Sequence, residues 1–150
     1  WKEGASAVAI RQGYLSIGEK GVVRVRVQGD LGFLTIKGRT SGISRAEFEY
    51  SISLRDATAL LMLCVGGLIT KTRYHVESAG TSWSVDVFDG ASQGLVVAEI
   101  ELDSEDGVFE RPDWLGKEVS HDHRYSNSSL SVRPYDKWKE GLSAEDPGSR

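Results

Sequence analysis

The sequence predicts a mainly β (α+β) domain built on an antiparallel sheet or barrel. Seven short segments alternate apolar and polar residues with a period of two, and turn residues separate them. Two of the separators, Gly29-Asp30 and Ala79-Gly80, are typical of tight β-hairpins. A length of 150 residues, 39% of them hydrophobic and 27% charged, indicates a single globular domain, 1–150.

The expected strands come in two groups, and a helix lies between them. We place strands at residues 8–17, 22–28, 32–37, 46–52, 70–77, 82–89 and 95–102. Residues 55–65 have apolar side chains at helical spacing, and Gly66-Gly67 follows as a signal for the end of that helix.

Short helices are expected after the last strand. Residues 104–118 begin with a capping serine followed by acidic residues, and internal Gly and Pro divide them into two short helices, the second at 112–119. A further helical turn is expected to begin at Ser126 or Asn127, and residues 141–150 resemble a flexible tail.

Composition excludes several classes of protein. With 18 basic and 22 acidic residues the net charge is −4, which gives no support to a nonspecific nucleic-acid binder. Cys64 is the only cysteine, so a disulfide framework is excluded and a reducing, cytoplasmic location is expected. No apolar stretch reaches the roughly 18–20 residues that span a bilayer, and no secretory signal is visible, so no membrane partner is expected.

Charged side chains share one face of six expected strands, and the opposite faces are apolar. Five are basic and five acidic: Arg24, Arg26, Lys37, Lys71, Arg73, Glu47, Glu49, Asp86, Glu99 and Glu101. One interpretation is a normal core with these charges in solvent; the other is a barrel whose charged faces line a water-filled lumen. Like charges two residues apart repel each other. A phosphoanhydride together with Mg²⁺ or Mn²⁺ would offset both signs.

The chain resembles the CYTH family of triphosphate tunnel metalloenzymes, in particular its short bacterial inorganic triphosphatases. The matching stretches run in the family's order over about residues 8–135. They are RQGYLS (11–16), VRVR (23–26), FLTIKG (33–38), SRAEFEY (44–50), KTRY (71–74), DVF (86–88), VVAEIEL (96–102), PDWLGKEV (112–119) and RYSN (124–127).

The resemblance implies an eight-stranded antiparallel tunnel that hydrolyses triphosphate compounds, most simply inorganic tripolyphosphate, with Mg²⁺ or Mn²⁺. By position, the basic residues that would bind phosphate are Arg24, Arg26, Lys37, Lys71 and Arg73. Glu99 and Glu101 would bind the metal. Glu47, Glu49 and Asp86 would support the metal or order the basic side chains. Tyr14 and Lys71 are the candidate catalytic residues, Tyr14 as a proton acceptor, and simple aromatic packing is the alternative for Tyr14.

The sequence departs from the family in one respect. The family's N-terminal strand carries the motif ExExK, which contributes two metal ligands and a phosphate-binding lysine, and no such motif occurs here. We therefore expect seven strands instead of eight, and interpret the difference as truncation of the first strand. Metal binding and turnover by this chain are accordingly expected to be weak.

Other functions stay open at this point. The same tunnel suits a class IV-like adenylate cyclase, a thiamine triphosphatase, or a non-catalytic polyphosphate- or nucleotide-binding module. Homodimerisation is also left open. His121 and His123 are two residues apart in an expected loop without a third ligand, so we do not expect a metal site there.

Overall fold

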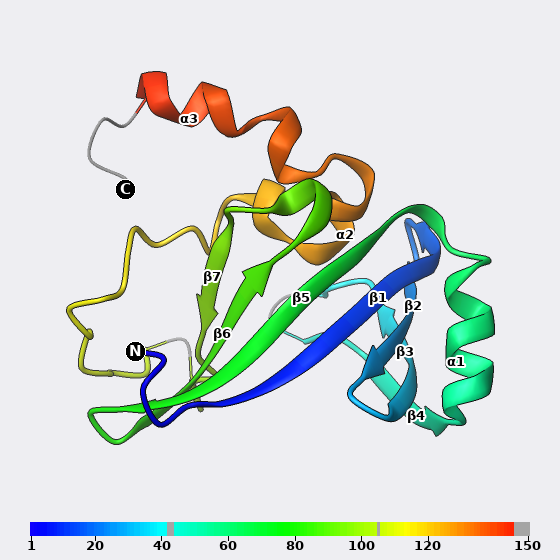
Figure 1. The fold of residues 1–150 in the computed structure, drawn as a ribbon, viewed down its shortest axis with the longest axis horizontal. Helices are drawn as coiled ribbons and strands as arrows, with labels where there is room; N and C mark the ends of the chain where they lie inside the picture. Colours follow the sequence, from blue (N-terminus) through cyan, green and yellow to red (C-terminus); the bar gives the residue numbers. More distant parts are fainter. Residues whose placement is uncertain (42–43, 105, 146–150) are drawn as a thin grey trace.

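The fold is an open, curved antiparallel sheet with short helices on both sides (Figure 1). The computed structural model describes residues 1–41, 44–104 and 106–145. Its seven strands are β1 (Ser6–Gly18), β2 (Gly21–Gln28), β3 (Leu31–Gly38), β4 (Glu47–Ile52), β5 (Val65–Ser78), β6 (Thr81–Phe88) and β7 (Val96–Glu99). In the described part of the chain they lie in the order β4-β3-β2-β1-β5-β6-β7, so β4 and β7 form the two edges. The mainly β, antiparallel prediction is confirmed, and over the described residues the sheet stays open.

Tight hairpins connect the strands where the sequence predicts them. Ala79 and Gly80 have φ angles of 50° and 73°, and these two residues alone join β5 to β6. Positive φ at both central residues is the geometry that twists with the strands. Gly29, with φ 56°, opens the equally short turn from β2 to β3.

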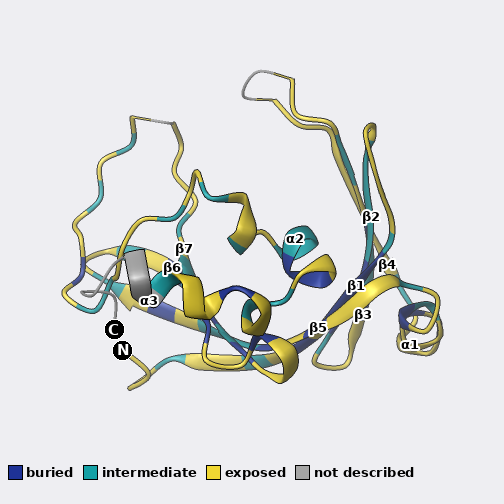
Figure 2. Cartoon of the chain, turned by 90° about the horizontal axis from the view of Figure 1, so that it is seen from above, coloured by how far each residue is buried: buried dark blue, intermediate teal, exposed yellow. Residues whose placement is uncertain are grey.

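The curvature gives the sheet a concave and a convex side (Figure 2). Helix α1 (Leu54–Leu61) lies on the convex side, where Ala57 and Leu61 pack against Val25 and Val27 of β2. Its first turn is capped by Ser53, whose hydroxyl accepts a hydrogen bond from the Asp56 backbone N–H at 3.0 Å.

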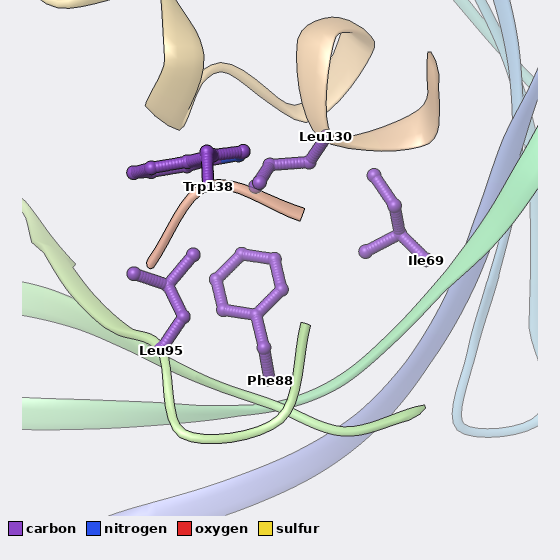
Figure 3. Packing of buried hydrophobic residues seen from close by; sticks show 5 residues of the cluster. All are labelled: Ile69, Phe88, Leu95, Leu130 and Trp138. Atoms are coloured by element: carbon purple, nitrogen blue, oxygen red, sulfur yellow. The ribbon is translucent and has the colours of Figure 1, made fainter. Parts of the chain in front are cut away.

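Helix α2 (Asn127–Val132) lies on the concave side, begins at one of the two predicted positions, and is capped by Ser126. A buried apolar cluster fixes it there (Figure 3). Leu130 of α2 and Trp138 pack against Ile69 of β5, Phe88 at the end of β6, and Leu95. All five side chains are at most 6% exposed, so this cluster is the main core of the concave side.

The segment after β7 covers the convex side of β5 and β6. Trp83 is buried between Phe109 and Trp114, at ring-centroid distances of 5.4 and 5.5 Å. The two helices predicted within 104–119 do not form among the residues described there, so that prediction is wrong. A single turn between Pro112 and Gly116 cannot offset the cost of helix nucleation, whereas Trp114 gains a buried aromatic contact.

The expected end of the first helix is also wrong. Helix α1 ends at Leu61, and Gly66 and Gly67 lie in β5. A Cβ atom on Gly66 would be 2.8 Å from the Ser131 backbone oxygen, and Gly66 has a φ of 70°. Gly66 is therefore needed because the backbone of α2 passes directly over this strand.

The C-terminal part contains short helical segments. These are η2 (His123–Tyr125), η3 (Tyr135–Lys137) and α3 (Lys139–Glu145), and η1 (Gly90–Ser92) precedes β7. The tail expected from Gly141 is thus helical as far as Glu145, and 146–150 lie outside the described residues. No helix in the described ranges is both long and apolar enough to cross a membrane.

Candidate functional site

The register of the sheet brings nine of the ten predicted charged side chains onto one face. In each antiparallel pair, directly opposite residues point to the same side. Lys71 of β5 lies opposite Phe88 of β6, whose side chain belongs to the core beneath α2, so this is the concave side. The same alternation gives this side the following charged residues: Arg24, Arg26, Lys37, Glu47, Glu49, Lys71, Arg73, Asp86 and Glu99.

On β2, β3 and β4 the charges of opposite sign meet across strands. The Arg26 guanidinium donates to Glu49 Oε1 at 2.9 Å, and Lys37 Nζ is 4.0 Å from Glu47 Oε1. Arg24 donates to Thr35 Oγ1 at 3.5 Å and forms a hydrogen bond with Tyr14, and it has no ion pair among the described residues. Burial, followed by the nearby Arg24 charge, lowers the pKa of Arg26 and of Lys37. This part of the face therefore concentrates positive charge that its own carboxylates only partly neutralise.

Three donors on the concave face are buried without a partner. The Nε atoms of Arg24 and Arg26 and the Nε2 atom of Gln12 have no hydrogen-bond acceptor in the described structure. Gln12 is 1% exposed and lies opposite Arg26 in the sheet. An unpaired buried donor is costly, and three on one face indicate a site for an anion. The sequence analysis assigned no role to Gln12.

Two basic residues on β5 share one buried carboxylate. Asp86 of β6 is 2% exposed and accepts hydrogen bonds from Lys71 Nζ at 2.6 Å and from Arg73 Nε and Nη2 at 2.7 and 2.8 Å. Burial alone raises the pKa of Asp86, but its hydrogen bonds and its charge contacts with Arg73 and Lys71 outweigh burial and hold that pKa below its usual value. Burial lowers the pKa of Lys71, and Asp86 offsets part of this effect.

Lys71 is enclosed more completely than the sequence suggests. It is 2% exposed, and its ammonium group also donates to Asn127 Oδ1 of α2 at 3.2 Å. The predicted roles of Lys71 in phosphate binding and catalysis stay predictions. Asn127 is a second site residue to which the sequence analysis gave no role.

Tyr14 lies on the same face, opposite Arg24 and 5% exposed. The pairing of β1 is irregular on both sides of it, and such bulges reorient side chains next to functional sites. Burial raises the pKa of Tyr14, although the Arg24 charge and hydrogen bond lower it in part. A phenol with a raised pKa stays protonated, so Tyr14 is better suited to donate a hydrogen bond than to accept a proton.

The two expected metal ligands lie at the β7 edge. Strand β7 ends at Glu99, earlier than predicted, so Glu101 follows in the adjoining loop. Both carboxylates line an open cavity of about 800 Å³ together with Arg73, whose Nη2 is 3.9 Å from Glu99 Oε2. In the part of the chain described, three or more potential ligands do not converge on one point. Two carboxylates suffice for a hard divalent ion whose other ligands are phosphate oxygens and water, so these residues fit such an ion.

A curved antiparallel sheet with unpaired cationic donors on its concave side defines an anion-binding β domain. The chain belongs to the CYTH domain family, which matches residues 3–135. The predicted family is therefore confirmed.

Two curated relatives are described as inorganic triphosphatases. One, from Acetivibrio thermocellus, is 48% identical over 141 residues, which are 93% of this chain and 90% of the relative. The other, from Nitrosomonas europaea, is 37% identical over 130 residues, 84% of this chain and 85% of the relative. The crystal structure of an inorganic triphosphatase superimposes with a TM-score of 0.67 at 34% identity, covering 85% of this chain and 87% of the other.

Proposed function

We propose that this chain binds inorganic triphosphate on its concave face and hydrolyses it with the help of a divalent metal ion, Mg²⁺ or Mn²⁺. The proposal is supported most directly by the buried, unpartnered donors of Arg24, Arg26 and Gln12. The relatives described as inorganic triphosphatases support the same substrate.

The basic residues act as the anion-binding groups of this proposal. Arg24 and Arg26 offer forked guanidinium donors, which suit phosphate oxygens on neighbouring groups of a linear chain. Lys37 and Arg73 contribute positive charge at the two sides of the face, and Lys71 contributes it from the interior. Tyr14 donates a hydrogen bond to a phosphate oxygen.

The acidic residues divide into two roles. Glu99 and Glu101 would hold the metal ion, which would neutralise phosphate charge and activate water. Glu47, Glu49 and Asp86 hold the basic side chains in place, because each contacts a lysine or arginine.

The reaction itself needs little covalent chemistry from the protein. Water adds to the terminal phosphorus, the bridging P–O bond breaks, and phosphate and pyrophosphate result, which between them carry the two protons of the water. Arg24, Arg26 and Arg73 neutralise the charge on the non-bridging oxygens as the leaving group departs.

Phosphate release tests this function against its alternatives. The chain is incubated with tripolyphosphate, ATP or thiamine triphosphate, each with Mg²⁺, with Mn²⁺ or with EDTA. We expect release from tripolyphosphate to depend on the metal and to exceed release from the two organic triphosphates, and to be slow because the sequence contains no ExExK motif. Cyclic AMP formed from ATP would indicate a cyclase, faster cleavage of thiamine triphosphate would indicate a thiamine triphosphatase, and tight binding without release would indicate a binding module.

A further inference from the structure

The side-chain amide of Asn127 is a neutral hydrogen-bond acceptor for the buried ammonium group of Lys71. It is the first residue of α2, and its Oδ1 lies 3.2 Å from Lys71 Nζ. The other partner of that ammonium group is Asp86, at 2.6 Å. Two of the three ammonium N–H groups thus have acceptors, only one of which is charged.

The Lys71 cluster, defined here as Lys71, Arg73, Asp86 and Asn127, carries one net positive charge, and the exposed carboxylate of Glu99 lies 3.9 Å from Arg73 Nη2 at its edge. Asp86 serves both cations, with one oxygen accepting from Lys71 and from Arg73 Nη2 and the other from Arg73 Nε. A second carboxylate at position 127 would satisfy Lys71 equally well and would cancel this charge. The amide of Asn127 accepts the hydrogen bond from Lys71 and does not cancel the positive charge of the cluster. Because the cluster is buried, solvent screens this charge only weakly.

Helix α2 does not depend on Asn127 for its place in the fold. Leu130, one turn later, is 2% exposed and packs in the core with Phe88 and Trp138. The backbone of Ser131 lies against Gly66 of β5. Packing and the Lys71 contact can therefore be changed separately.

We propose that Asn127 is a positioning residue that holds Lys71 beside Arg73 without neutralising it, so that the Lys71 cluster adds its positive charge to the triphosphate site. This inference rests on the proposed function. In this role Asn127 affects the affinity for the anion. If Asn127 were only structural, a substitution there would lower anion affinity only as far as it lowered stability.

Two variants separate the two roles. Asn127→Asp keeps the size and an acceptor but adds a negative charge, whereas Leu130→Ala weakens the packing of α2 and leaves the cluster intact. The measurements are the dissociation constant for tripolyphosphate in EDTA, by calorimetry, and the thermal unfolding midpoint without ligand.

For Asn127→Asp we expect a dissociation constant raised by about tenfold or more with no fall in the unfolding midpoint. For Leu130→Ala we expect a lower midpoint and a dissociation constant within about twofold of the original. Two results for Asn127→Asp would overturn the proposal. One is a loss of affinity that merely accompanies a loss of stability, and the other is an unchanged affinity.

A third variant tests the proposal in case the Asn127→Asp protein does not fold. Asn127→Ala removes the acceptor without adding charge, and we expect weaker tripolyphosphate binding than in Leu130→Ala. Equal affinity of Asn127→Ala and the unmodified chain also contradicts the inference. If the unmodified chain binds no tripolyphosphate, the proposed function fails as well, whereas binding that no variant weakens overturns the role of Asn127 alone.

Discussion

Asp86 is the residue on which the buried charges depend. Its carboxylate, 2% exposed, contacts both Lys71 and Arg73 at hydrogen-bond distance. Removing one partner of a buried ion pair leaves the other charge uncompensated, which costs far more than the loss of an exposed pair. The sequence identifies Asp86 as a charged residue opposite an apolar face, but not as the partner of two cations.

We predict that Asp86→Asn lowers the free energy of unfolding by about 3–5 kcal/mol at neutral pH. The pKa of Asp86 is depressed in the folded state, so its contribution to stability is present above the unfolded-state pKa of about 4 and is lost as pH falls through the folded-state value. Urea denaturation of both proteins between neutral and acidic pH measures this. The two stabilities should converge on acidification.

Asp122→Asn is the matched control for this variant. Asp122 pairs with Arg124 at 2.6 Å, but both side chains are substantially exposed to solvent. Its replacement should change stability by less than about 1 kcal/mol. A loss as large as that of Asp86→Asn would show that burial of the pair is not the cause.

The end of strand β7 determines where the two proposed metal ligands lie. Because the strand ends at Glu99, Glu101 lies in the loop that lines the same cavity. We predict that replacing both glutamates by Gln abolishes metal-dependent phosphate release and preserves or raises stability without metal, since a pair of like charges is removed. Phosphate release against metal concentration, with thermal unfolding in EDTA, measures both effects.

Glu19→Gln, in the exposed turn between β1 and β2, serves as the control for charge loss. It should keep the metal response of the unmodified chain. Normal metal-dependent hydrolysis by the double Gln variant would mean that these two carboxylates do not hold the ion.

Helices and strands could be predicted where residues close in sequence determine them. Alternation and the Ala79-Gly80 turn predict the strands and hairpins, because both depend on residues close in sequence. Gly66-Gly67 was misinterpreted as a helix end, because its real cause is the backbone of Ser131 arriving from far along the chain. Trp114 was misassigned to a helix for the same kind of reason, since Trp83 on β6 determines its place.

The candidate site divides in the same way. The face shared by Arg24, Arg26 and Glu49 follows from a period of two and was predicted from the sequence. The burial of Lys71 and its contact with Asn127 depend on where α2 docks, which no local pattern specifies.

At the scale of the whole molecule, the two sides of the curved sheet differ in what they contain. The convex side holds the cores beneath α1 and around Trp83. The concave side combines the core around Leu130 with the charged face. The positive charge of that face should attract a polyanion. Salt should weaken this attraction, because partly exposed charges are screened.

The most direct test is calorimetric titration with tripolyphosphate in EDTA at increasing salt, for the unmodified chain, Arg24→Ala and Arg11→Ala. Arg11 is an exposed arginine whose partner in β2, Val27, belongs to the core on the convex side, so it is a control for general charge. We predict that salt weakens binding and that Arg24→Ala raises the dissociation constant at least tenfold, about 1.5–3 kcal/mol for a charge-assisted contact. Arg11→Ala should bind as the unmodified chain does. Absence of binding, or an equal loss in the two variants, would contradict a triphosphate site on the concave face.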